Sequence, residues 1–184
     1  MLYRLANRVR VLVVVLALAA CTAETDIADE ATLERGAELL LPFKRDLQEA
    51  LKSGLEKGPV EAISVCRFQA PAIATSLSRD GIRLGRTSHR LRNPANQSPG
   101  WVSPVLESYL ENPGSRAARI VPLPGGRSGY VEPIVLQPLC LSCHGETLAP
   151  DLAERVAELY PDDRATGFNV GDLRGVFWVE FAMR

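Results

Sequence analysis

The sequence predicts an α+β domain with an antiparallel sheet, and three observations support this class. Apolar residues recur at the three-, four- and seven-residue steps of helices between residues 31 and 77. Beyond residue 80, short segments of β composition alternate with turns rich in Gly and Pro. Helices that precede a run of strands are typical of α+β proteins. With 184 residues, of which 46% are hydrophobic, the chain is long enough to bury the core of one domain.

Two long helices are expected at the start of this domain. Apolar residues at helical spacing predict the first over residues 31–55, with a bend at Pro42. Gly58-Pro59 fits the end of one helix and the first turn of the next. The second helix is expected over residues 60–77, and its apolar face includes Cys66.

The rest of the chain is expected to supply the strands. Residues 82–87 alternate apolar and polar side chains and predict the first strand, and the basic stretch 89–100 predicts a loop. Beyond it, the patterns predict a helix over 101–111, a hairpin of strands over 118–123 and 129–136, a helix over 150–159 and a strand over 174–183.

The N-terminus has the pattern of a bacterial lipoprotein signal. A basic stretch over residues 4–10 precedes a short apolar run that ends in Leu18-Ala19-Ala20-Cys21, which resembles a lipobox. We therefore predict a signal peptide over 1–20, a polar tether over 21–30 and one domain over 31–184. Acylation of Cys21 would anchor the domain on the periplasmic side of a bacterial membrane. The alternative is ordinary cleavage beside a cysteine that carries no lipid.

The stretch Cys140-Leu141-Ser142-Cys143-His144 has the spacing of a c-type haem attachment signal. Two thiols a few residues apart can add to the two vinyl groups of haem, and the imidazole that follows can bind the iron. A thioredoxin-like redox pair and part of a zinc site are the alternatives. Zinc would need a fourth ligand from few remaining candidates, and no βαβ unit is predicted. We therefore predict one covalent haem c on Cys140 and Cys143, with His144 as the proximal iron ligand.

Cys66 is the cysteine that the lipid and haem assignments leave without a role. An unpaired thiol is unusual in an oxidising compartment. On an apolar helix face, the simplest interpretation is a small buried hydrophobic side chain. The candidates for the sixth coordination position of the iron are Cys66, His89 in the basic loop, Met183 near the C-terminus, or no residue.

Arg86, Arg90 and Arg92 are candidates for contacts with the haem propionates, because guanidinium groups bind carboxylates in bidentate geometry. The alternative is a solvated loop, or ion pairs with acidic residues of the stretch 162–172. The formal net charge is −1 and no basic face is predicted, so a nucleic acid partner is not expected.

Several stretches together resemble one known family. They are Val65-Cys66-Arg67, Arg86-Thr87-Ser88, Arg92-Asn93-Pro94-Ala95-Asn96, Cys140 to Gly145, Tyr160-Pro161-Asp162-Asp163, Ala165-Thr166-Gly167 and Gly171-Asp172-Leu173-Arg174-Gly175. They look like the PAS-like periplasmic c-type haem proteins, formerly a domain of unknown function and also found as the sensor module of histidine kinases. The resemblance implies a PAS-like antiparallel sheet flanked by helices, with His144 proximal and Cys66 distal on the haem iron. His89 departs from the family's pattern and stays an alternative distal ligand.

A buried thiolate opposite histidine favours ferric iron and makes ligation sensitive to reduction. We therefore expect a redox or small-ligand (gas) sensor or signalling module that acts through an unidentified redox or signalling protein. The alternative is a lipid-anchored mono-haem electron-transfer cytochrome. No Ser-His-Asp set, carboxylate pair or phosphate loop stands out, so side-chain catalysis is not predicted. A peroxidase-like enzyme would need His89 as its acid–base residue.

Overall fold

The computed structural model describes the backbone of residues 2–182 and the side chains of residues 29–182. Cys21 and Met183 therefore lie outside the described side chains. The elements are α1 (Leu2–Leu55), α2 (Pro59–Leu77), β1 (Arg83–Thr87), the 3₁₀ turn η1 (Pro94–Asn96), α3 (Ser103–Glu111), β2 (Arg119–Leu123), β3 (Arg127–Val135), the 3₁₀ turn η2 (Pro138–Cys140), α4 (Leu141–His144), α5 (Pro150–Leu159) and β4 (Leu173–Ala182).

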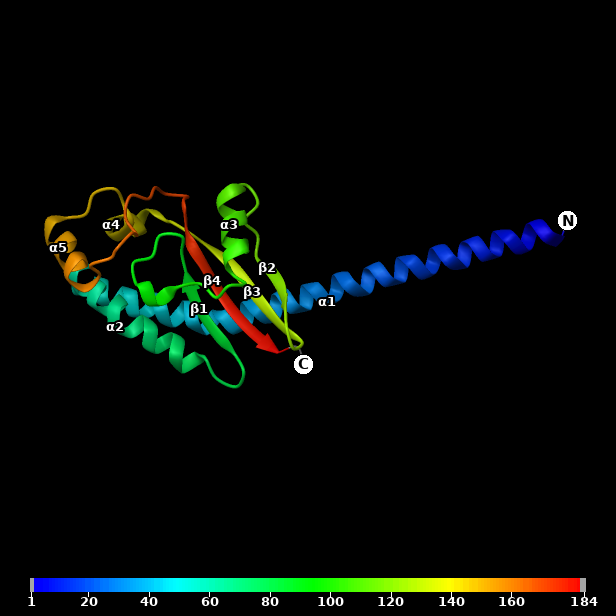
Figure 1. Cartoon of the computed structure of the whole chain (residues 1–184), viewed down its shortest axis with the longest axis horizontal. Helices are drawn as coiled ribbons and strands as arrows, with labels where there is room; N and C mark the ends of the chain where they lie inside the picture. The colour runs from blue at the N-terminus through cyan, green and yellow to red at the C-terminus, as the bar shows by residue number, and fades with distance from the viewer. Residues whose placement is uncertain (1, 183–184) are drawn as a thin grey trace.

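The strands form one antiparallel sheet in the order β1-β4-β3-β2. β4 pairs with β1 on one side and with β3 on the other, and helices flank the sheet (Figure 1). The predicted α+β class, with a PAS-like antiparallel sheet flanked by helices and a long N-terminal helix, is confirmed. The predicted strands differ from the observed ones by one or two residues at their ends.

The first helix begins earlier than the sequence predicted. We expected it to start near residue 31, whereas α1 already starts at Leu2. No Gly or Pro occurs between residues 2 and 35, so nothing in this stretch interrupts a helix. α1 continues through Pro42, and α2 likewise continues through Pro71. The division into signal peptide, tether and domain stays a prediction. Among the described residues, no helix has both the length and the apolar character needed to cross a membrane.

The two faces of the sheet bury separate apolar clusters, because successive side chains of a strand point to opposite faces. On one face, α1 packs through Leu40 and Phe43 against a cluster that includes Val179 of β4. On the other, α3 packs against a cluster that includes Val176 and Trp178. β4 therefore contributes side chains to both clusters of the core.

The hairpin between β2 and β3 turns through Pro124, Gly125 and Gly126. Gly125 and Gly126 have φ angles of 74° and 68°, which favour glycine because a side chain is strained in this region. The stretch Pro124-Gly125-Gly126 therefore suits the turn of the hairpin that the sequence predicted between these two strands.

A third cluster brings the C-terminal half of the chain against α2. Ile63 of α2 packs with Leu152 and Val156 of α5 and with Tyr160, and Cys143 borders the same cluster. Cys66 lies three residues after Ile63, so both residues project from the same side of α2. This packing places the attachment motif and Cys66 on the same side of the molecule.

Candidate haem site

The attachment motif forms a tight helical turn. Cys140 is the last residue of η2, and Cys143 and His144 end the short helix α4. The three-residue spacing puts both thiols on one side of this turn. The Cys140 sulfur accepts a hydrogen bond from the backbone N–H of Gln137 at 3.4 Å. Cys66, Cys140 and Cys143, the cysteines whose side chains are described, are all free thiols.

The loop after Tyr160 holds His144 in one orientation. The Nδ1 atom of His144 lies 2.7 Å from the carbonyl oxygen of Ala165. A carbonyl oxygen only accepts, so Nδ1 carries the proton and the lone pair on Nε2 is left for a metal. The backbone N–H of Phe168 also donates to the carbonyl oxygen of His144 at 3.0 Å. The sequence alone gave no sign of the hydrogen bond between His144 and Ala165, because its acceptor is a backbone carbonyl.

The surroundings of His144 favour its neutral form. Burial, followed by the positive charges of Arg174 and Arg92, lowers the pKa of His144 to about 3, against the opposing hydrogen bond to Ala165. A neutral imidazole is the form that binds a metal ion.

A buried ion pair ties the attachment turn to the two loops around it. Arg92 binds Asp163 through two contacts, Nε to Oδ1 at 3.1 Å and Nη2 to Oδ2 at 3.2 Å. The same Nη2 donates to the carbonyl oxygen of Cys143 at 2.6 Å. The Asp163 carboxylate also accepts the backbone N–H of Ala165 at 2.9 Å. The sequence suggested Arg92 for contact with a propionate, or for an ion pair with an acidic residue of 162–172. The structure shows the ion pair, with Asp163.

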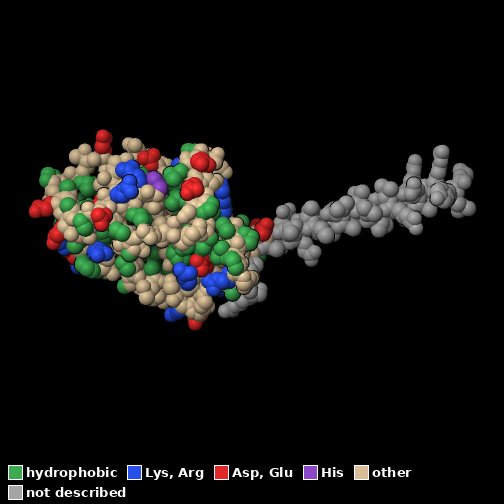
Figure 2. Space-filling model, viewed as in Figure 1, with side chains coloured by type: hydrophobic (Ala, Val, Ile, Leu, Met, Phe, Trp, Pro, Cys, Tyr) green, Lys and Arg blue, Asp and Glu red, His purple; other side chains and the backbone are tan. Residues whose placement is uncertain are grey.

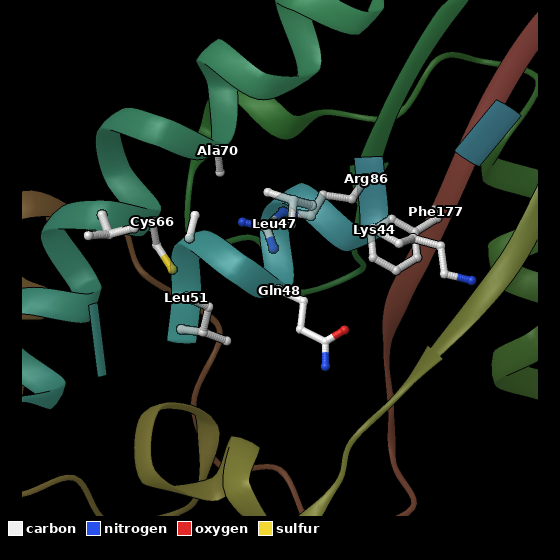
Figure 3. A pocket seen from close by; sticks show the side chains of 10 residues that line it. Lys44, Leu47, Gln48, Leu51, Cys66, Ala70, Arg86 and Phe177 are labelled. Carbon is white, nitrogen blue, oxygen red and sulfur yellow. The ribbon is translucent and has the colours of Figure 1, made fainter. Parts of the chain in front are cut away.

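Cys66 lines a cavity of about 300 Å³ between α1, α2, β1 and β4. Figure 3 shows Cys66 of α2 near Leu51 of α1 at one end, with Arg86 and Phe177 of the sheet at the other. Most of the lining is apolar, as in small-molecule sites that have few polar groups.

Cys66 is also close to the attachment turn. Burial raises the pKa of the Cys143 thiol, Arg92 opposes this rise, and the thiols of Cys66 and Cys140 add to it. The three sulfur atoms are therefore within electrostatic range of one another. Burial of the Tyr160 hydroxyl raises its pKa, with Cys66 adding to the rise, so Tyr160 belongs to the same neighbourhood.

His89 and Arg90 lie around Phe168. The rings of His89 and Phe168 meet edge to face with their centroids 5.8 Å apart, and His89 stays exposed and does not line the cavity. Partial burial of the ring, then the charges of Arg174 and Arg90, lower the pKa of His89. Arg90 stacks 4.4 Å from the Phe168 ring centre and donates to the carbonyl oxygens of Arg164, Thr166 and Gly167.

Arg86 lines the cavity and, among the described residues, has no hydrogen-bond or ion-pair partner for its side chain. The sequence suggested Arg86, Arg90 and Arg92 equally for contacts with the propionates, whereas in the structure only Arg86 of these three faces the cavity with a free guanidinium.

Figure 2 shows acidic and basic side chains interspersed over the visible face, with basic groups beside a histidine.

Comparison with known proteins supports the resemblance seen in the motifs. The family model described as Tll0287-like matches residues 20–182. The chain belongs to this family. Among solved structures, it is similar to the cyanobacterial haem protein Tll0287, with 28% identity and a TM-score of 0.53 over 65% of this chain and 73% of that chain. A comparison with curated proteins gave no match. The resemblance to a family of haem proteins that the motifs indicated is thereby confirmed.

Among the described side chains, no group of three or more His, Cys, Asp or Glu residues is placed to hold a metal ion. Haem iron needs only two axial ligands from the protein, so a haem site does not depend on such a group.

Proposed function

We propose that this Tll0287-like protein binds one haem c, with thioether bonds to Cys140 and Cys143 and with His144 and Cys66 as axial ligands. The observation that carries the proposal is the position of Cys66, which lines an apolar cavity and lies near Cys143 of the attachment turn. The 28% identity to a cyanobacterial haem protein supports the cofactor. His89 is the weaker candidate for the distal ligand because it is exposed and outside the cavity lining.

The residues fit such a cofactor chemically. The fixed tautomer of His144 presents Nε2 as a ligand, and the low pKa keeps the imidazole neutral. Each cysteine thiol would add across a vinyl group of the bound haem, its sulfur bonding to one carbon and its hydrogen going to the other, with no net oxidation. A haem supplies a redox-active iron when bound. The protein's own task is to fix the attachment turn, which the Arg92–Asp163 pair and the Ala165 carbonyl do.

A redox or small-ligand sensor is the function that this ligand pair supports best. A thiolate binds ferric iron more strongly than ferrous iron, because the reduced metal attracts the anion less. Cys66 lies beside a cavity, which leaves space for its side chain to move away from the iron. Ligation at Cys66 would therefore respond to reduction, or to CO or NO after reduction, and a signalling partner would read that change.

An electron-transfer cytochrome is the second candidate, and one observation favours it. Leu139 is 66% exposed and directly precedes Cys140, so the predicted haem edge at this thioether lies close to the surface. A redox partner that docks there would approach the iron closely. Electron exchange with no change of ligation would support the carrier, whereas loss of the Cys66 ligand on reduction would support the sensor.

We further propose that acylation of Cys21 anchors the protein on the periplasmic side of a bacterial membrane, since the lipobox-like pattern predicts it. Cys21→Ala should release the protein from membranes or block its processing. Absence of labelled fatty acid in the wild-type protein would rule out this anchor.

Covalent attachment is tested by co-expression with a cytochrome c maturation system. The wild-type protein should be red and keep its haem through denaturing electrophoresis and acid-acetone extraction. Cys140→Ala and Cys143→Ala should each weaken or abolish attachment, whereas Cys66→Ser, the matched control, should keep the haem covalently bound. A colourless wild-type protein, or haem that passes into the solvent, would refute the proposal.

A further inference from the structure

Arg174, the second residue of β4, is a partly buried arginine within one of the family-like motifs, and the proposed function does not use it. The backbone beside Arg174 packs closely against the end of β1. A Cβ on the neighbouring Gly175 would collide with the carbonyl oxygen of Thr87. The hydroxyl of Ser88 donates to the carbonyl oxygen of Arg174 at 2.6 Å. One terminal nitrogen of Arg174 donates to the carbonyl oxygen of Arg90 at 3.1 Å. The backbone of Arg174 and one terminal nitrogen of its guanidinium are therefore both held in place.

The Arg174 guanidinium is only partly satisfied by the protein. Its Nε atom is buried and, among the described residues, has no hydrogen-bond partner. An unsatisfied buried group of this kind is rare in native proteins and calls for an explanation, such as a bound ligand. The described residues offer it no ion pair, because the nearby Asp163 is bound to Arg92.

Most of the charged groups around Arg174 are also positive. Burial, then repulsion by Arg86 and Arg92, lowers the pKa of Arg174 to about 9, with Asp163 opposing. Arg174 is also the charged group that most lowers the pKa of His144, so it lies near the predicted proximal ligand. Four guanidinium groups (Arg86, Arg90, Arg92 and Arg174) and the carboxylate of Asp163 leave a local excess of positive charge beside the predicted haem.

We propose that Arg174, together with Arg86, binds a propionate carboxylate of the haem. This inference rests on the proposed function, because it assigns an anion that the haem itself carries. A carboxylate can accept from the Nε of Arg174 and from the free guanidinium of Arg86, which faces the cavity. Arg90 and Arg92 are structural in this assignment, since their donors already bind protein oxygens.

The assignment has a consequence for the iron. A fixed positive charge near the iron favours the reduced form, which carries one positive charge less. Arg174 therefore opposes the preference of the thiolate for ferric iron and raises the midpoint potential.

The test uses the haem-loaded full chain with Arg174→Met, Arg174→Lys and the control Arg164→Met, an exposed arginine in the neighbouring loop. Resonance Raman spectra report the propionate-bending bands, and redox titration reports the midpoint potential. Arg174→Met should shift the propionate bands and lower the midpoint potential, and Arg164→Met should change neither. Arg174→Lys keeps the charge but loses the planar group, so it should shift the bands while the potential stays closer to wild type.

The two Arg174 variants keep the inference testable if one does not mature. Unchanged propionate bands and potential in a haem-loaded Arg174 variant would overturn the inference and leave the proposed function intact. A wild-type protein that carries no covalent haem would overturn both.

Discussion

Replacement of Arg92 by methionine should destabilise the protein strongly, because it leaves the Asp163 carboxylate buried and unpaired. Arg92 is 8% exposed and the Asp163 side chain is 10% exposed, so water screens neither charge well. Removing one partner of a buried ion pair costs about 3–5 kcal/mol. A typical domain has about 5–15 kcal/mol of stability, so the loss would be a large share of the total.

Denaturant unfolding of Arg92→Met at pH 7 measures this loss. The matched control is Arg35→Met, which removes a pair whose side chains are 48% and 59% exposed. An exposed pair contributes about 0–1 kcal/mol, so the control should change stability little. Asp163→Asn should cost about as much as Arg92→Met, and the double variant should cost less than the sum, because the two groups interact directly.

A cost below about 1 kcal/mol for Arg92→Met, together with additive effects in the double variant, would contradict the assignment of this ion pair as the anchor of the attachment turn. If Arg92→Met lowered the free energy of unfolding of the haem-loaded protein but not of the haem-free protein, Arg92 would instead be assigned to a propionate, as the sequence suggested.

Two further substitutions test the core beneath α1. The Tyr130 hydroxyl donates to Glu132 at 2.9 Å, so Tyr130→Phe should cost about 1.5–3 kcal/mol at neutral pH. Burial, then the Glu132 charge, raises the pKa of Tyr130 above its ordinary 10.0, so the folded state keeps a proton that the unfolded state loses. Wild-type stability should therefore fall as pH rises above 10.0, and the fall should be shallower in Tyr130→Phe; equal slopes would refute the argument. In α1, a Cβ at Gly36 would collide with the Tyr130 ring, so Gly36→Ala should cost about 1–3 kcal/mol even though alanine favours a helix by about 1 kcal/mol. Gly100→Ala, where an added methyl meets no atom, should stay within about 0.5 kcal/mol of wild type, and a similar effect at both glycines would contradict the packing argument.

The elements of this fold were predictable because their signals are local. Apolar spacing over residues 60–77 and the Gly58-Pro59 boundary predict α2, which runs from Pro59 to Leu77. The stretch Pro124-Gly125-Gly126 indicates the hairpin turn between β2 and β3, where both glycines adopt positive φ angles. The start of α1 was not predictable in the same way, since helical steps of apolar residues become clear only after residue 31.

The site was predictable where residue type and spacing carry the chemistry. The spacing of Cys140, Cys143 and His144 is such a signal, and Cys66 drew attention as the cysteine without a role. The Arg92–Asp163 pair spans 71 residues of sequence, and the acceptor of the His144 ring is a backbone carbonyl. The sequence therefore offered ion pairs with residues 162–172 only as an alternative for the arginines, and it gave no sign of the contact between His144 and Ala165. Arg174 is the second residue of the largely apolar strand β4, and a charge in that position was the available signal for its buried Nε atom.

The pairing of His144 with Cys66 across the haem is the central claim, and electron paramagnetic resonance of the ferric protein tests it most directly. The wild-type protein should give a low-spin spectrum of the thiolate–imidazole type. Cys66→Ser should convert it to a high-spin or water-ligated spectrum and raise the midpoint potential, while His89→Ala should leave both nearly unchanged. Conversion by His89→Ala, with no effect of Cys66→Ser, would contradict the account and identify a bis-histidine haem.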